Sequence, residues 1–174
     1  MNSVDPSRDE IITNLSTNQS ESVEEFRREP LDGRAGRRLI EAFHREIVQI
    51  YPFWTPAVGP TAEPEEFEPP NGAFLVVYSR GEPVGCGGFK RLDARTAEIK
   101  RMYVAPVARN KGLGRRILEQ LEGGAHEAGY AFVRLDTGDK QPEALTLYRS
   151  AGYREIPDYN GNPAASYWFE KALR

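Results

Sequence analysis

Short apolar or alternating segments predict most of the strands of this chain. Residues 74–78 form an apolar segment, whereas apolar and polar residues alternate along 96–104. Polar turns at 79–82 and 92–95 separate neighbouring segments, and the first of them is short enough for a hairpin. The predicted strands lie at residues 23–28, 74–78, 84–91, 96–104 and 132–137, with two closing strands near Tyr153 and Tyr167.

Apolar residues recur with helical spacing in three other segments. These segments are residues 37–50, residues 117–128 after a glycine-rich run, and residues 142–150. Residues 51–72 hold many of the prolines and are predicted to be irregular, with a short helix near Glu65. Antiparallel strands followed by alternating strands and helices predict the α/β class, with a mixed sheet and helices on both faces.

The composition indicates one domain preceded by a polar tail. The chain has 174 residues, 39% of them hydrophobic, which is enough for a single core. We therefore predict one domain over residues 21–174. Residues 1–20 are rich in Ser, Asn, Thr and Asp and are predicted to be a mobile tail.

Charge and cysteine content exclude several function classes. The 23 basic and 26 acidic residues give a net charge of −3, which argues against a nucleic-acid partner. One cysteine excludes an internal disulfide, and two histidines with one cysteine give no convincing metal-ligand set. No apolar run is long enough to span a membrane or resembles a signal peptide, so we expect a cytoplasmic protein with no membrane partner.

A basic glycine run over residues 109–116, Arg-Asn-Lys-Gly-Leu-Gly-Arg-Arg, stands between a predicted strand and a predicted helix. The first turn of such a helix has unpaired N–H groups and the positive end of the helix dipole, which together bind phosphate. Gly112 and Gly114 have no Cβ to hold an anion away, and either can adopt positive φ. The spacing fits neither a Walker loop nor a dinucleotide fingerprint. The alternative is that the glycines only cap a turn before a surface helix.

Two motifs in the same order resemble those of one family. The pattern R-x-x-G-x-G after Val104 resembles the acetyl-CoA loop of the GNAT superfamily of N-acetyltransferases. Residues 144–153 resemble the A-x-x-L-Y-x-x-x-G-[FY] helix of that family, and the resemblance extends over about residues 26–173. It implies a GNAT-like fold, whose central, mostly antiparallel sheet has a parallel βαβ core that binds the cofactor. It also implies acetyl transfer from acetyl-CoA to an amine.

The resemblance also implies which residues bind acetyl-CoA. The backbone at the end of the 96–104 strand would bind the pantetheine arm, and the glycine run would bind the pyrophosphate. The implied cofactor-binding residues are Met102, Tyr103, Val104, Arg109, Asn110, Lys111, Gly112, Leu113, Gly114, Arg115 and Gln141. No metal is expected.

Glu98 and Tyr148 are the catalytic candidates. An alkyl amine has a pKa of about 10.4, so a base or a water relay aids attack at neutral pH, and in the family a glutamate at the position of Glu98 can be that base. Strand alternation would place Glu98 and Lys100 on one face with Met102 and Val104. Tyr148 corresponds to the tyrosine that protonates the departing thiolate. The alternatives are a solvated charged surface for Glu98 and simple core packing for Tyr148.

The acceptor is expected to contact Tyr51, Trp54, Asp136 and Thr137. Tyr51 and Trp54 belong to a region that walls the acceptor pocket in the family, or else form a hydrophobic patch folded onto the core. Asp136 and Thr137 end a predicted strand where the family's sheet opens, or else cap the next turn. Mixed charges at Arg95, Lys100, Arg101, Glu98 and Asp136 would suit an acceptor that carries a carboxylate as well as an amine.

The single cysteine and the two histidines are not expected to take part in catalysis. Cys86 is predicted to be a buried small residue, and the glycines around it are predicted to let a ligand approach the strand. His44 and His126 are predicted to be surface or boundary residues. The expected partners are acetyl-CoA and a small amine acceptor, while homodimerisation stays open. A non-catalytic acyl-CoA sensor and an acetyltransferase for protein N-termini or lysines are the alternative functions.

Overall fold

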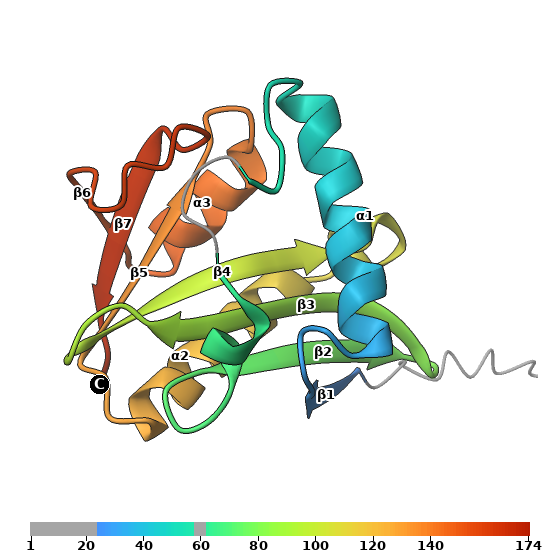
Figure 1. Cartoon of the computed structure of the whole chain (residues 1–174), viewed down its shortest axis with the longest axis horizontal. Helices are drawn as coiled ribbons and strands as arrows, with labels where there is room; N and C mark the ends of the chain where they lie inside the picture. Colours follow the sequence, from blue (N-terminus) through green and yellow to red (C-terminus); the bar gives the residue numbers. More distant parts are fainter. Residues whose placement is uncertain (1–23, 58–61) are drawn as a thin grey trace, which may run out of the picture.

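Seven strands form one mixed sheet in residues 24–57 and 62–174, which the computed structural model describes (Figure 1). The strands are β1 (Glu25–Arg28), β2 (Ala73–Ser79), β3 (Glu82–Arg91), β4 (Thr96–Val104), β5 (Phe132–Thr137), β6 (Arg154–Ile156) and β7 (Tyr167–Ala172). The helices are α1 (Arg34–Ile50), α2 (Leu113–Glu127) and α3 (Pro142–Ser150), with 3₁₀ turns η1 (Pro64–Phe67) and η2 (Pro106–Ala108). The predicted tail, residues 1–20, and the predicted strand start at residue 23 lie outside the described residues.

The sheet has the order β1-β2-β3-β4-β5-β7-β6, and only the β4–β5 pair is parallel. Helix α2 makes the crossover between these two strands, as a parallel connection requires. The prediction of a mostly antiparallel sheet with one βαβ unit is therefore confirmed. None of the described helices is long and apolar enough to cross a membrane.

Helices cover both faces of the sheet. On one face, Leu39 and Ile40 of α1 join a buried cluster with Phe74 and Val76 of β2. On the other face, the apolar side of α2 is completely buried against the sheet, and α3 extends the same cluster. Burial of one such aliphatic side chain stabilises the fold by about 1.5–3 kcal/mol, so packing on both faces contributes to the stability of the sheet.

The glycines of β3 are needed for helix packing, which corrects the prediction that they admit a ligand. A Cβ added at Gly85 would lie 3.0 Å from Ile117, and one at Gly87 would lie 3.0 Å from Leu121. Both contacts are with α2, so the missing side chains let this helix approach the sheet closely. Gly88 faces Phe67 and Phe74 in a similar way.

Strands β4 and β5 diverge after a short paired segment. Only Thr96–Glu98 pairs with Phe132–Arg134, although β5 continues its pairing with β7 as far as Thr137. Figure 1 shows the two strands separating toward the end of the sheet nearest α3. Among the described residues, the rest of β4 therefore has no strand neighbour on that side, and its backbone groups there can meet a ligand.

A β-bulge at Arg101 changes which residues of β4 share a face. Arg101 has φ 60°, and the β3–β4 register shifts between Cys86 and Gly88. Tyr103 therefore joins the cluster beneath α1, whereas Met102 and Val104 pack against the α2 side. The prediction that Met102 and Val104 share the face of Glu98 and Lys100 is wrong, because the bulge interrupts the alternation.

Candidate active site

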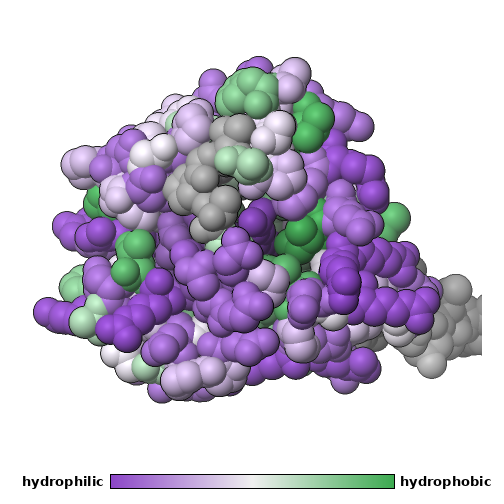
Figure 2. Space-filling model, viewed as in Figure 1, coloured by the Kyte–Doolittle hydropathy of each residue, from purple (hydrophilic) through white to green (hydrophobic). Residues whose placement is uncertain are grey.

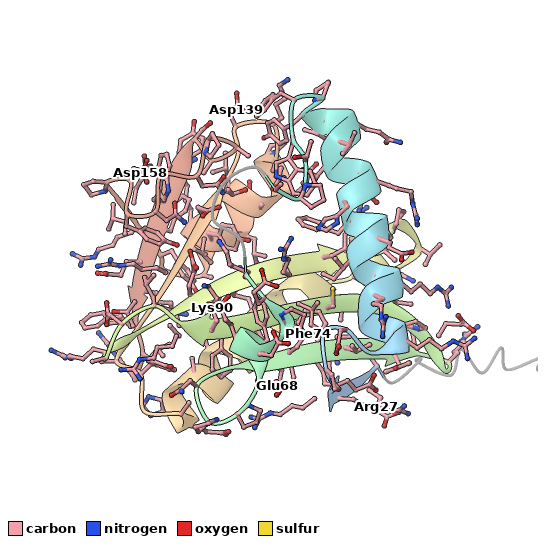
Figure 3. The ribbon with its side chains drawn as sticks, viewed as in Figure 1. Arg27, Glu68, Phe74, Lys90, Asp139 and Asp158 are labelled. Carbon is pink, nitrogen blue, oxygen red and sulfur yellow. The ribbon has the colours of Figure 1, made fainter. Side chains whose placement is uncertain are left out.

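The space between the diverging strands is a cavity closed by α1 on one side and α3 on the other. Figure 2 shows the surface hollowed in this region, and Figure 3 places Asp139 and Asp158 in the two loops at this end of the sheet. The residues lining it are Phe43, Ile47, Tyr51, Trp54, Pro56, Ile99, Lys100, Arg101, Met102, Asp136, Thr137, Gly138, Gln141, Tyr148, Asn162 and Ala164. Both apolar and charged groups therefore face the same space.

Seven of the predicted site residues meet at this cavity. They are Met102, Gln141 and Tyr148, together with Tyr51, Trp54, Asp136 and Thr137. The hydroxyl of Thr137 donates to Oε1 of Gln141 at 2.9 Å, which ties the end of β5 to the start of α3. Arg95 is not part of this site, because it lies at the opposite end of β4 with its guanidinium over the Phe132 ring.

Tyr148 packs in the core and also lines the cavity. Its ring packs against Tyr153 and Phe169, with centroids 5.9 and 6.0 Å away. Its hydroxyl has no hydrogen-bond partner among the described residues, and because no fully buried side-chain oxygen or nitrogen there is left unpaired, this oxygen is open to the cavity that Tyr148 lines. Burial first, and then the charge of Asp136, raises the pKa of the Tyr148 phenol above its usual value. The hydroxyl therefore stays protonated at neutral pH and is available as a donor.

Glu98 lies behind the cavity wall in a polar network. The residue is only 2% exposed, and its Oε1 accepts hydrogen bonds from Tyr159 at 2.9 Å and Asn160 at 3.0 Å. Lys100 donates to the same oxygen at 3.2 Å. Burial, followed by the charge of Glu98, raises the pKa of Tyr159, so this phenol is held in its donating form. A proton can reach Glu98 only through a neighbouring group or a water molecule.

Asp136 is the carboxylate that faces the cavity directly. Asn160 donates to its Oδ2 at 2.6 Å, and Asn162 donates to its Oδ1 at 2.9 Å. The ammonium of Lys100 lies 3.8 Å from Oδ2. One asparagine amide thus bridges Glu98 and Asp136, and these contacts hold two carboxylates and one ammonium in fixed positions.

The loop between β6 and β7 supplies the residues that the sequence analysis missed. Asp158 accepts from the backbone N–H groups of Asn160 and Gly161, which forms a tight polar turn. Trp168 donates to Oδ1 of Asn160 at 2.9 Å and so fixes the orientation of its amide. A run of Asp, Asn and Gly is by itself only a turn signal, and its contacts here are with strands distant in the sequence.

The glycine run forms the start of α2, close to the cavity. Gly112 is the N-cap residue and has φ 74°, and Asn110 has φ 61°. No side chain of the described residues caps this helix and no acidic residue lies in its first turn, so the first N–H groups and the positive helix end can meet an anion. A Cβ on Gly114 would lie 3.6 Å from Leu147 of α3. The predicted phosphate loop and the Tyr148 helix are therefore neighbours.

The basic side chains around this turn differ in their surroundings. Arg115 donates to the hydroxyl of Ser150 at 2.5 Å, at the end of α3. Arg109 donates to the carbonyl of Val104 at 2.9 Å and to Glu46 at 2.6 Å. Arg116 forms an ion pair with Glu24, the residue before β1, so part of its positive charge is neutralised. Leu113 is buried, so only its backbone N–H is suited to bind an anion.

Tyr51 and His44 have structural contacts beyond their predicted roles. The Tyr51 hydroxyl accepts from the N–H of Lys140 at 3.0 Å and therefore fixes the β5–α3 loop as well as walling the cavity. His44 is half-buried, and its ring lies 5.0 Å from that of Trp54. It also hydrogen-bonds Arg101 at 3.0 Å, so it is a boundary residue, as predicted, that contacts two residues of the cavity wall.

Comparisons with known proteins give one consistent family. The sequence model of the Acetyltransferase (GNAT) family matches residues 37–153. An IAA acetyltransferase of Azospirillum brasilense is 33% identical over 139 residues, which are 78% of this chain and 89% of the relative.

Two solved structures share the fold. An acetyltransferase of the GNAT family from Staphylococcus aureus superposes with a TM-score of 0.69 at 19% identity, covering 87% of this chain and 100% of the other. A GNAT family acetyltransferase from Elizabethkingia anophelis, with acetyl-CoA bound, has a TM-score of 0.61 at 17% identity, covering 86% and 98%.

Proposed function

Because the chain belongs to the acetyltransferase (GNAT) family, we propose that it moves an acetyl group from acetyl-CoA to the primary amine of a small acceptor. The observation that carries this proposal is the Tyr148 hydroxyl. It faces a cavity at the divergence of β4 and β5, beside the uncapped start of α2. Thioester and amine would meet in this cavity, with a proton donor already present.

The shape of the site supports acetyl-CoA as donor. The N–H groups at the start of α2 would bind the pyrophosphate, and the open edge of β4 would bind the amide groups of the pantetheine arm. The structure from Elizabethkingia anophelis carries acetyl-CoA on the same fold, which supports acetyl-CoA as the ligand. The thioester would then lie near Met102 and Tyr148, which both line the cavity.

The reaction needs a neutral amine and a protonated leaving thiolate. The amine nitrogen attacks the thioester carbonyl carbon, the C–S bond breaks, and the amine loses one proton. Tyr148 would donate its proton to the departing sulfur, since a thiol with a pKa near 8.5 is a modest leaving group. Asp136, which lines the cavity, would receive or relay the amine proton, with Glu98 behind it as the base.

We predict that Glu98→Gln lowers kcat/KM mainly at low pH. The loss should be about 10- to 100-fold near pH 7 and should shrink toward the pKa of the amine, where less deprotonation is needed. Glu122→Gln is the matched control, because Glu122 also accepts from a tyrosine and a lysine but lies away from the cavity. The pH dependence of kcat/KM for both variants is the measurement. An equal loss of kcat/KM at every pH in Glu98→Gln would mean that Glu98 does not accept the proton of the amine.

We predict direct transfer within a ternary complex. Cys86 is completely buried and its Sγ contacts the carbonyl of Arg101 at 3.5 Å. Burial raises the pKa of the Cys86 thiol to about 12, so it offers no thiolate for an acyl intermediate at neutral pH. Initial rates of CoA release, measured while acetyl-CoA and amine are both varied, should give intersecting lines. Parallel lines, or an acetyl group found on Cys86, would contradict the proposal.

A further inference from the structure

Arg101 is a largely buried cation with unused hydrogen-bond donors. Its only hydrogen bond within the described residues joins Nη1 to Nε2 of His44 at 3.0 Å. It forms no ion pair with any described carboxylate, and Glu63 acts on it only as a more distant charge. The side chain lines the cavity, so Nε and Nη2 can meet a ligand there.

The bulge in β4 is what aims this side chain into the cavity. A non-glycine residue at φ 60° is sterically disfavoured, and bulges commonly redirect a side chain beside a functional site. Because of it, Lys100 and Arg101 both line the cavity, although they are adjacent in a strand. Their surroundings differ, since Lys100 lies 3.2 Å from Glu98 and 3.8 Å from Asp136.

The cavity therefore has two electrostatically different regions. In one region, the two carboxylates of Glu98 and Asp136 lie beside the single ammonium of Lys100, so negative charge is in excess. In the other, Arg101 forms no ion pair with any described residue, and Glu63 acts on it only from a distance. His44 does not neutralise it: burial first, and then the charge of Arg101, lowers the pKa of His44, so the ring is neutral and accepts at Nε2.

Apolar side chains line part of the same cavity. Phe43 and Ile47 of α1 and Trp54 line the cavity beside Arg101. In such surroundings a planar guanidinium favours an anion that it can bind with two parallel hydrogen bonds. One unmatched positive charge fits a monoanionic carboxylate better than a phosphate dianion, which would leave a buried negative charge uncompensated.

We propose that Arg101 binds the carboxylate of an amino-acid-like acceptor whose amine lies toward Asp136. This assignment rests on the proposed acetyl transfer and adds the substrate class. The carboxylate of the acceptor would thus pair with Arg101, and its amine would lie near the carboxylate of Asp136. An apolar side chain of the acceptor would contact Trp54 and Phe43. Decarboxylated and amidated analogues would leave the Arg101 guanidinium unpaired.

The first test is acetyl transfer to matched sets of acceptors: an amino acid with an apolar side chain, its primary amide and its decarboxylated amine. The wild-type enzyme should favour the amino acid, and Arg101→Gln should raise its KM by roughly 10- to 100-fold while sparing the amide. Arg101→Lys should restore part of the loss, since it keeps the charge. Arg95→Gln, far from the cavity, is the control. A wild-type preference for the amide or amine would overturn the proposal.

A second test does not depend on turnover. Binding of 3-phenylpropanoate and 3-phenylpropanamide to the CoA-saturated protein is measured by calorimetry in wild type and Arg101→Gln. The carboxylate should bind the wild type at least about tenfold tighter than the amide, and Arg101→Gln should abolish the difference while retaining CoA affinity. Equal binding of the two probes to wild type would refute the carboxylate site. If the carboxylate preference holds but no amine is acetylated, the proposed function fails and the carboxylate site stands.

Discussion

Gly112→Val should raise the KM for acetyl-CoA tenfold or more and weaken CoA binding to a similar extent. Gly112 caps α2 with φ 74°, a conformation that valine adopts only with strain. Apart from its two chain neighbours, no described residue has an atom within 4 Å of an added Cβ, so the protein itself has room for the side chain. The added bulk would instead occupy the approach of the pyrophosphate to the first N–H groups of the helix.

Gly129→Val separates this effect from backbone strain. Gly129 follows the other end of the same helix, has φ 93° and likewise has no atom within 4 Å of an added Cβ. Both variants should therefore lose similar stability in thermal unfolding, while only Gly112→Val loses CoA affinity in a calorimetric titration. Unchanged CoA affinity in a folded Gly112→Val protein would refute the phosphate loop.

Tyr148→Phe should lower kcat by roughly 10- to 1,000-fold with little change in the affinity for acetyl-CoA. The substitution removes only a hydroxyl, and the ring can keep its contacts with Tyr153 and Phe169. The hydroxyl makes no hydrogen bond within the described residues, so its loss leaves no protein group there unpaired. What is lost is the proton donor for the thiolate, an interaction that matters in the transition state.

Tyr153→Phe is the matched control for this experiment. Tyr153 is buried beside Tyr148, but its hydroxyl donates to Glu122 at 2.9 Å on the α2 side. That variant should lose some stability and keep its turnover. Wild-type turnover in Tyr148→Phe would mean that Tyr148 only packs. A large loss of cofactor affinity would instead mean that the hydroxyl anchors the thioester, with water as the proton donor.

The sequence predicted the elements whose signals are local. Strand 96–104, strand 132–137 and helix 142–150 have the predicted bounds, because their apolar periodicity and flanking turns lie within each segment. The glycine run likewise forms the start of α2, as a strand–turn–helix order requires. Tyr148 fits both of its predicted roles, core packing and proton donation, since its ring belongs to the core and the residue lines the cavity.

The sequence did not predict features that depend on tertiary contacts. The bulge at Arg101 has no local signal, because arginine at positive φ is disfavoured and only the surrounding sheet stabilises it. Glu98 is buried by Tyr159 and Asn160, about sixty residues later in the chain. The contact between His44 and Arg101 was not predicted either, because these residues are also far apart in the sequence.

The most direct test of the proposed function is a measurement of CoA release with a library of primary amines. The wild-type protein is incubated with acetyl-CoA and each amine, free thiol is followed with a thiol reagent, and the products are analysed by mass spectrometry. We expect amine-dependent thiol release, with one N-acetylated amine formed for each CoA. Binding of acetyl-CoA without amine-dependent thiol release for any small amine, protein N-terminus or lysine peptide would contradict the account and indicate a non-catalytic acyl-CoA-binding module.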